Sequence, residues 1–352
     1  MTEARGDFRR SAGVLCAVAS LAAAAGNLGC SRAKDAPGRT DASSAGGTGG
    51  ASAASGTGGG GGAGGDAPYA IAPLAPALAF DATPDAGAAY VYFTGVDASG
   101  RAGVFRVSAR GGASAAAIAV GPPFVAPLGI AASTDGGRLF VADPGAGSSA
   151  LDDAGALFAI ELPGGAVAPV QGGEGLRARG LEVAHGANGE ARLVFSGRAR
   201  EGGQPGVFSV PARGGEASAI ATGSPLVDPS GVAVARGGDV FVCDTLASPD
   251  GTATIFRIED GFVSPFATGL RVGYPCGLAL TRDEAALFVL ARDVSRDADE
   301  VVRIEVASGA RSTMATGAAR RSEPGGLHRA RAADVFAFVD ASVDASVDAS
   351  VD

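Results

Sequence analysis

The stretch SGVAVARGGDVFVCD, residues 230–244, contains the pattern that decides the fold of this chain. A run of small and apolar residues is followed by a Gly-Gly pair and then by an apolar burst that ends at Cys243 and Asp244. Two short apolar runs joined by a glycine turn are typical of a β-hairpin. Variants of the pattern occur five more times, so the chain contains an internal repeat.

Each repeat contains up to four short runs, which we name strands A to D. The six copies of strand A are ALAFDA (77–82), LGIAAS (128–133), RGLEVA (179–184), SGVAVA (230–235), CGLALT (276–281) and GGLHRA (325–330). The bulkier strand B is centred on Tyr92, Phe140, Val194, Phe241, Phe288 and Phe336. Strand C appears as VFRV (104–107), LFAI (157–160), VFSV (207–210), IFRI (255–258) and VVRI (301–304). A shorter run, strand D, closes most units.

Four short strands in a unit of roughly 50 residues, repeated six times, predict an all-β fold, a six-bladed β-propeller with antiparallel four-stranded blades. A right-handed β-helix is the alternative, but its coils are shorter than these units. The sixth blade is incomplete, because strands A and B (325–338) are followed by the repetitive DASVDASVDASVD (340–352). The segment PYAIAPLA (68–75) is expected to add an outer strand to that blade and so protect its edge.

The N-terminal part has the features of an export signal. A basic region with Arg5, Arg9 and Arg10 precedes an apolar stretch at 11–26 that is too short to span a bilayer. The following NLGC (27–30) resembles a bacterial lipobox, which implies lipidation of Cys30. Ordinary signal cleavage and a retained membrane anchor remain alternatives.

The chain is therefore divided into four parts. Residues 1–30 are the predicted signal peptide, 31–66 a tether of mostly Gly, Ala, Ser and Thr, 67–339 the propeller, and 340–352 an acidic tail. The tether has too little apolar surface to offset the entropy of ordering it, so we expect it to be disordered. The valine spacing of the tail favours neither a strand nor a helix, and we expect disorder there as well. This organisation predicts a lipid-anchored protein of the outer membrane or periplasm of a Gram-negative bacterium.

The charge distribution excludes one class of partner. The formal net charge is −9, the basic residues are arginines apart from Lys34, and no basic run is present. Nucleic acid is therefore not expected as a partner. A monomer is expected, with contact to the membrane through the lipid anchor only and an unknown protein or small-molecule ligand as partner.

The repeat resembles the six-bladed propellers of the NHL and gluconolactonase-like type. The nearest matches to that pattern are PSGVAVARGGDVFVCD (229–244) and PCGLALTRDEAALFVL (275–290). The resemblance implies the architecture but not the function, since these propellers include lactonases, lyases and binding modules. Gluconolactonase-like enzymes hold their metal with a glutamate at the first blade, an asparagine and an aspartate. Here PLAPAL precedes the first strand A, and Asn188 lies in an A-to-B turn on the opposite face, so that site does not carry over.

Ligands are expected at the face formed by the D-to-A and B-to-C loops, because long loops on a rigid scaffold concentrate binding residues. Asp143 and Asp244 end strand B in blades 2 and 4. Each either caps its loop by accepting backbone N–H groups or binds a divalent metal such as Ca²⁺. No cofactor other than such a cation is expected. The acidic residues of one long loop, Asp293, Asp297, Asp299 and Glu300, match no calcium loop and are expected to be solvated.

Two histidines and two cysteines complete the candidates. His185 is expected to be exposed in a turn, whereas His328 faces the axis and is, with Glu323, a weak candidate for general acid–base catalysis. Cys243 ends strand B of blade 4 and Cys276 begins strand A of blade 5, at the same face of adjacent blades. In an exported protein this placement predicts a disulfide, the alternative being two buried free thiols.

Three functional hypotheses follow. The first is a tethered, non-catalytic propeller that offers its loop face to a ligand or protein. The second is a diverged lactonase-like or lyase-like enzyme that uses Asp143, Asp244 and His328. The third is a truncated product, indicated by the incomplete sixth unit.

Overall fold

A computed structural model describes residues 13–20, 70–73, 78–109, 115–147, 154–186, 188–296, 298–315 and 324–342. All regular secondary structure in these ranges is β-strand. Within them no helix has the length and apolarity that crossing a bilayer requires.

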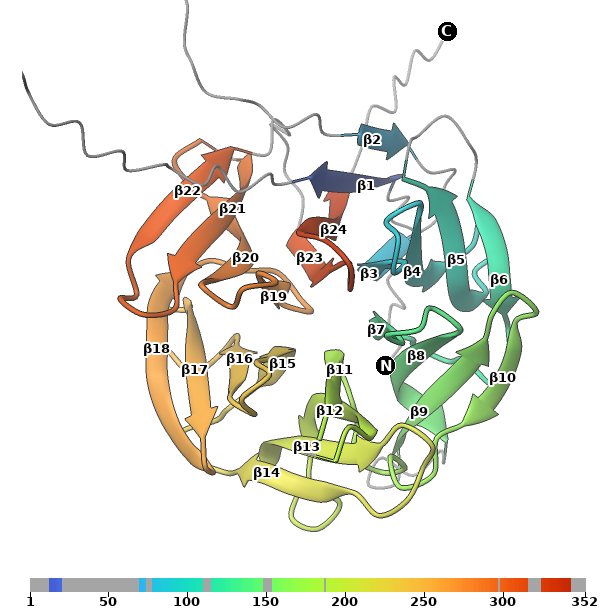
Figure 1. Cartoon of the computed structure of the whole chain (residues 1–352), viewed down its shortest axis with the longest axis horizontal. Helices are drawn as coiled ribbons and strands as arrows, with labels where there is room; N and C mark the ends of the chain where they lie inside the picture. Colours follow the sequence, from blue (N-terminus) through green and yellow to red (C-terminus); the bar gives the residue numbers. More distant parts are fainter. Residues whose placement is uncertain are drawn as a thin grey trace, which may run out of the picture. The chain divides into compact units, whose positions relative to one another are not determined.

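Five antiparallel sheets, each built from four consecutive strands, are arranged radially around an axis (Figure 1). Blade 1 contains β3 (Leu78–Pro84), β4 (Tyr90–Val96), β5 (Ala102–Ser108) and β6 (Ala116–Val120). Blade 2 contains β7 (Gly129–Ala132), β8 (Arg138–Gly147), β9 (Ala154–Glu161) and β10 (Ala166–Pro169). Blade 3 contains β11 (Leu181–His185), β12 (Ala191–Arg198), β13 (Pro205–Pro211) and β14 (Ser218–Thr222). Blade 4 contains β15 (Pro229–Val234), β16 (Val240–Asp244), β17 (Ala253–Glu259) and β18 (Phe262–Leu270). Blade 5 contains β19 (Leu278–Leu280), β20 (Ala286–Asp293), β21 (Ala298–Glu305) and β22 (Arg311–Ala315). The predicted β-propeller of antiparallel four-stranded blades is confirmed, but the structure contains five such blades of consecutive strands where the sequence predicted six.

The register of the sheets confirms the alignment of the repeats. In blade 2 Ala131 of the innermost strand pairs with Phe140, and in blade 4 Ala233 pairs with Phe241. The centres of the other second strands pair with the innermost strand in the same way. All six centres are buried. Alanine lies opposite the centre of the second strand in blades 2, 4 and 5, whereas Thr83, Glu182 and Arg329 occupy that place in the other sheets. The large residues of the second strands fill the space between blades.

The second strand of a blade packs on both neighbouring blades, which explains its continuous apolar sequence. In β8, Phe140 and Ala142 belong to a core shared with blade 3. Leu139 and Val141, on the opposite face of the same strand, belong to a core shared with blade 1. A strand covered on both faces has no position for a solvated side chain, so alternation is lost.

Glycine at the start of the innermost strands allows neighbouring blades to approach each other. A Cβ on Gly129 would lie 2.1 Å from the Arg179 carbonyl oxygen, and one on Gly180 would lie 2.0 Å from that of Ser230. The same relation continues around the axis, because a Cβ on Gly326 would lie 1.6 Å from Oδ1 of Asp81 in blade 1. Asp81 then accepts the Ile130 N–H of blade 2 at 3.0 Å. The contacts along the axis thus form a closed cycle.

A sixth four-stranded sheet lies between blades 5 and 1. Its own strands are β23 (Pro324–Arg329) and β24 (Val335–Ser342), and the order is β2-β1-β24-β23. The outermost strand is β2 (Ala70–Pro73), which agrees with the expectation that 68–75 supplies an outer strand.

The third strand of this sheet, β1 (Gly13–Ser20), was not anticipated. It pairs antiparallel with β24 over eight positions, from Gly13↔Ser342 to Ser20↔Val335. Its sequence was assigned to the export signal, but a short apolar run also suits a strand between two others. A signal peptide that is removed does not remain in a sheet, so β1 belongs to the uncleaved chain.

The boundary of the acidic tail also differs from the expectation. β24 continues to Ser342, past the predicted boundary at 339/340 and through the first Val-Asp-Ala-Ser unit. This unit alternates apolar and polar residues with a period of two, which is the period of a strand. The interpretation that its spacing suits no strand is therefore wrong for the first unit.

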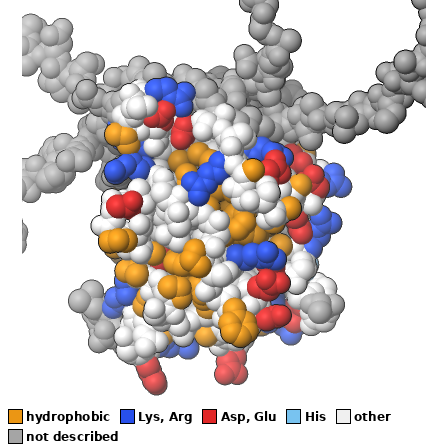
Figure 2. Space-filling model, turned by 90° about the vertical axis from the view of Figure 1, so that its left-hand side faces the viewer, with side chains coloured by type: hydrophobic (Ala, Val, Ile, Leu, Met, Phe, Trp, Pro, Cys, Tyr) orange, Lys and Arg blue, Asp and Glu red, His pale blue; other side chains and the backbone are white. Residues whose placement is uncertain are grey.

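The outer surface carries charges of both signs. Figure 2 shows acidic and basic side chains interspersed with hydrophobic ones on the side that lies to the left in Figure 1, near β18 and β22. Phe262, at the start of β18, is 80% exposed.

Candidate functional site

Asp143 and Asp244 hold the loops of the face that was expected to bind ligands. Asp143 accepts the backbone N–H groups of Val125 at 2.8 Å and of Ala126 at 2.9 Å, from the loop between blades 1 and 2. Asp244 accepts those of Val227 at 2.7 Å and of Leu246 at 3.1 Å. Burial raises the pKa of Asp143, although its backbone N–H bonds oppose this shift. Both carboxylates therefore act as loop caps in this structure.

The capped loops present apolar side chains to solvent. Val125 is 62% exposed, Val227 45% and Leu246 61%. Val294, in the long loop of blade 5, is 61% exposed. All four side chains belong to loops at this face of the propeller, where they are available to a partner. We name these four residues the loop-face apolar set.

A polar cluster that the sequence did not reveal lies beside this set. Asp228 binds Arg179 Nη1 at 2.5 Å and Arg198 Nη2 at 3.3 Å. The Arg179 guanidinium lies 5.4 Å from the ring centroid of Tyr274, a distance that permits a cation–π contact. Burial raises the pKa of Tyr274 to about 12, so its hydroxyl stays protonated at neutral pH. The cluster joins blades 3, 4 and 5 next to the axis.

Cys243 and Cys276 form a disulfide between blades 4 and 5, with their Cα atoms 6.2 Å apart. Both residues are buried. The backbone N–H of Cys276 also donates to Ser230 Oγ at 3.1 Å. The bridge thus lies under the loop face, where it fixes two adjacent blades.

His328 lies buried at the axis between two carboxylates. Its Nε2 lies 3.0 Å from Asp81 Oδ2 and its Nδ1 lies 3.7 Å from Glu182 Oε2. Glu182 in turn forms an ion pair with Arg331. Neither Asp81 nor Glu182 was anticipated from the sequence, and Glu323, the expected partner, lies outside the described residues. This network joins blades 1 and 3 to the sheet that contains β23 and β24 across the axis.

The charged groups of this network determine the protonation states of His328 and Glu182. Burial alone would lower the pKa of His328, but Asp81 and Glu182 raise it to about 10. Burial alone would raise the pKa of Glu182, but Arg331 and His328 hold it at about 2. At neutral pH His328 is therefore an imidazolium with a bound proton, which is a poor general base.

The expectation that the acidic loop residues are solvated is wrong for Asp299, which is only 3% exposed. Cys30 and Asp297 lie outside the described residues. Within the part of the chain that the structure describes, no group of three or more His, Cys, Asp or Glu is arranged to hold a metal ion.

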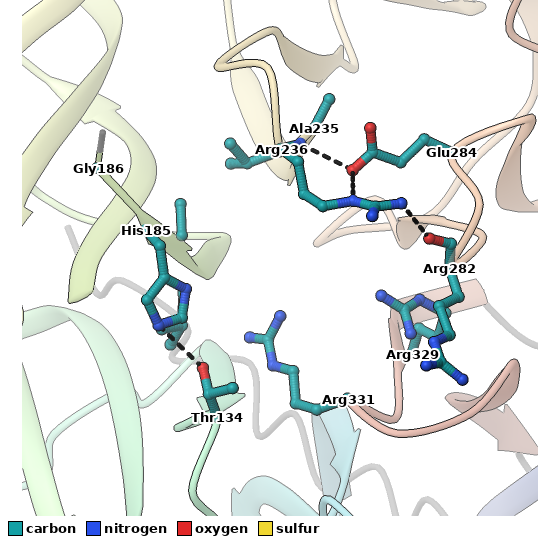
Figure 3. A pocket seen from close by; sticks show the side chains of 12 residues that line it. Thr134, His185, Gly186, Ala235, Arg236, Arg282, Glu284, Arg329 and Arg331 are labelled. Carbon is teal, nitrogen blue, oxygen red and sulfur yellow. Dashed lines mark hydrogen bonds and ion pairs between the residues drawn. The ribbon is translucent and has the colours of Figure 1, made fainter. Parts of the chain in front are cut away.

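A pocket of about 440 Å³ lies at the A-to-B turns, the opposite end of the axis from the loop face. In Figure 3, Thr134 and His185 lie on one side, Arg282 and Arg329 on the other, and Arg331 between them. Arg236 and Glu284 complete this part of the wall. Sequence reasoning expected ligands at the loop face and did not anticipate this pocket.

A signal for the pocket is nevertheless present in the sequence. The residue directly after each six-residue strand A run, from the second repeat to the sixth, lines the pocket. These residues are Thr134, His185, Arg236, Arg282 and Arg331. Five of the six repeats thus each contribute one polar side chain to the wall of this pocket.

No family model matches the chain, and no curated protein matches it. Solved structures do. A chain of the nidogen/laminin complex is 15% identical over 73% of this chain and 88% of its own length, with a TM-score of 0.53. A putative TolB from Agrobacterium tumefaciens is 13% identical, over 76% of this chain and 91% of its own, with a TM-score of 0.53. TolB from Acinetobacter baumannii is 10% identical, over 71% of this chain and 60% of its own, with a TM-score of 0.51.

The fold and these similarities define the class: the chain is a β-propeller protein. At such low identities the likeness to the nidogen/laminin and TolB structures concerns the fold alone.

Proposed function

We propose that this chain is a non-catalytic β-propeller scaffold that binds a protein through its loop face. The observation that carries the proposal is the loop-face apolar set. The carboxylates of Asp143 and Asp244 accept backbone N–H groups and so fix the loops from which Val125, Val227 and Leu246 project. Rigid loops with exposed apolar side chains are suited to binding, because little conformational entropy is lost when a partner docks.

We also propose that the protein is exported and anchored by a lipid on Cys30 at the outer membrane or in the periplasm of a Gram-negative bacterium, in a form that begins at Cys30 and therefore lacks β1. The NLGC motif and the 31–66 segment support this part of the proposal. A long Gly-rich tether allows a domain to reach partners away from the membrane surface.

A diverged lactonase-like or lyase-like enzyme is the alternative. Its candidates Asp143 and Asp244 are engaged with backbone N–H groups, and His328 holds its proton between two carboxylates. All three side chains thus have structural partners. Metal analysis of the purified protein separates the two functions, since a stoichiometric divalent ion favours the enzyme.

Site-specific photo-crosslinking in cells tests the scaffold. A photoreactive amino acid at Val227 or Leu246 should give a discrete crosslinked product. The same amino acid at Phe262 is the matched control, because Phe262 is more exposed but lies at the outer edge of blade 4. Equal crosslinking at all three positions, or none at the loop face, contradicts the proposal.

The anchor is tested separately with Cys30→Ser in a Gram-negative host. The unchanged chain should incorporate radiolabelled palmitate and sediment with membranes, and the variant should do neither. Palmitate incorporation by the variant would show that Cys30 is not the anchor.

A further inference from the structure

We propose that the pocket at the A-to-B turns binds a small hydroxycarboxylate anion. This site lies at the opposite end of the axis from the loop-face apolar set, so it is independent of the proposed scaffold function. The argument rests on the charge of the pocket, on the way its arginines are held, and on its size.

Two arginines of the pocket, Arg282 and Arg329, donate hydrogen bonds to backbone carbonyls, and Arg329 also has Asp334 at 3.9 Å. Arg282 Nη1 donates to the Ala332 carbonyl oxygen at 3.3 Å. Arg329 donates through Nε to the Leu280 carbonyl at 2.8 Å and through Nη1 to the Ala330 carbonyl at 2.7 Å. A carbonyl orients a guanidinium without cancelling its charge, so both remain able to attract an anion.

The other two arginines are paired with acids. Arg236 Nε lies 2.9 Å from Glu284 Oε1, and Arg331 forms its ion pair with Glu182. Asp334 lies 3.9 Å from Arg329 Nε and accepts the backbone N–H of Arg282 at 2.6 Å.

Four arginines thus face three carboxylates, which leaves a surplus of one positive charge (4 − 3 = 1). This surplus arises in a chain whose formal net charge is −9. A monoanion would balance it, whereas a dianion would exceed it.

The arrangement of donors favours a carboxylate. Guanidinium groups bind carboxylates with paired N–H bonds, and such charge-assisted bonds are stronger than neutral ones. Arg329 is fixed by its carbonyl contacts, and Arg331 by Glu182 and by the Ala132 carbonyl at 3.2 Å. Because they are already ordered, binding would cost little side-chain entropy.

The opposite wall favours hydroxyl groups on the ligand. Thr134 Oγ1 lies 3.4 Å from His185 Nε2, at the long end of a hydrogen bond, and both side chains face the arginines across the pocket (Figure 3). Each is able to donate to or accept from a hydroxyl group. A volume of about 440 Å³ lies within the usual range for small-molecule sites. A sugar acid combines these properties.

Isothermal titration of the purified full-length protein tests the site, with glucuronate as the probe, glucose as its neutral analogue and inorganic phosphate as a second anion. We expect glucuronate to bind about tenfold or more tightly than glucose, which corresponds to one charge-assisted interaction. Added salt should weaken glucuronate binding. Binding of glucose equal to that of glucuronate overturns the proposal, and tighter binding of phosphate overturns the assignment to a carboxylate.

Variants locate the binding. Arg282 is exposed and is held mainly by backbone groups, so Arg282→Gln should fold and should lower the affinity for glucuronate by about fivefold or more. Arg282→Lys keeps the charge and should retain part of the affinity. Arg101→Gln is the matched control, because Arg101 lies in a B-to-C loop, where it pairs with Asp97 at 2.8 Å. Unchanged affinity in Arg282→Gln, or an equal loss in Arg101→Gln, shows that the anion does not bind in this pocket.

Discussion

Gly180 directly precedes β11, the innermost strand of blade 3, at a point where the backbone of blade 4 passes close by. A methyl group there would lie 2.0 Å from the Ser230 carbonyl oxygen and 2.8 Å from the Gly231 Cα. Backbone atoms cannot move aside as a flexible side chain does, so the two blades would have to separate. The identity of this one residue therefore controls the distance between two blades.

We expect Gly180→Ala to lower the free energy of unfolding by about 2 kcal/mol or more, as overpacking of a rigid contact does. Gly237→Ala is the control, since a Cβ at Gly237 has no atom within 4 Å and this glycine is not among those with positive φ. That change should be neutral or slightly stabilising, because alanine restricts the unfolded chain more than glycine does. Chemical denaturation measures both, and equal midpoints would show that the contact at Gly180 carries no constraint.

At the scale of elements, the disulfide joins the end of β16 to the residues before β19. The two cysteines are separated by 33 positions in the sequence. Closing a loop of this size stabilises a protein by roughly 3–4 kcal/mol in the chain-entropy model.

We expect the paired substitution Cys243→Ala with Cys276→Ala to lower the free energy of unfolding by roughly that amount, measured by denaturant titration. Peptide mapping of the unreduced protein should recover the two cysteines in one linked peptide. Alkylation of both in the unreduced native protein would instead establish free thiols.

The strand β1 contributes to the fold only while it is attached. A chain that begins at residue 22 lacks it and leaves β24 without its neighbour over eight paired positions. An unpaired sheet edge loses hydrogen bonds and invites association.

We expect such a chain to unfold with a free energy lower by about 2 kcal/mol or more than that of a chain beginning at residue 13, which retains β1. Denaturation curves and light scattering of the two chains test this. Identical stability would mean that β1 adds nothing to the sheet, in agreement with its assignment to a removable signal.

At the scale of the whole molecule, the His328 network connects blades that are far apart in the sequence. The pKa of His328 is raised to about 10, so its proton is held more tightly in the folded state than in the unfolded state. Its contribution to stability is complete below a pH of about 6.5, the ordinary histidine pKa, and is lost as the pH rises toward 10. Glu182 acts in the opposite sense: with its pKa lowered to about 2, its contribution is complete above about 4.5 and is lost as the pH falls toward 2.

We therefore expect maximal stability between about pH 5 and 6.5, with an alkaline loss of at most about 1.4 kcal/mol per pH unit from His328. Urea denaturation at a series of pH values measures this. His328→Gln should be less stable at pH 6 and should show a flatter decline from pH 7 to 9. A decline as steep as that of the unchanged protein would assign the pH dependence to other groups.

Some candidate residues were placed correctly by sequence and others were not. Asp244 ends its strand as expected, because strand and turn patterns are local, whereas β8 continues past Asp143 to Gly147. The pairing of Cys243 with Cys276 followed from the antiparallel order within a repeat. The partners of His328 did not follow, because Asp81 lies 247 positions away and Glu182 lies in another blade. The arginine-lined pocket did not follow either, because its polar side chains come from single positions in five different repeats and meet only when the sheets close around the axis.

The sequence alone determined the radial arrangement of repeated sheets, because the strand pattern recurs in every repeat and most repeats add glycine turns and small residues near the axis. The tertiary structure decided what each end of the axis contains. Side chains from turns about 50 residues apart meet only when the blades close around the axis. The tertiary structure also decided how the last sheet is completed. Strand β24 pairs on one edge with β1, from the N-terminal part of the chain, and on the other with β23, from the C-terminal part. Local pattern specifies a blade, whereas contacts between blades specify the sites.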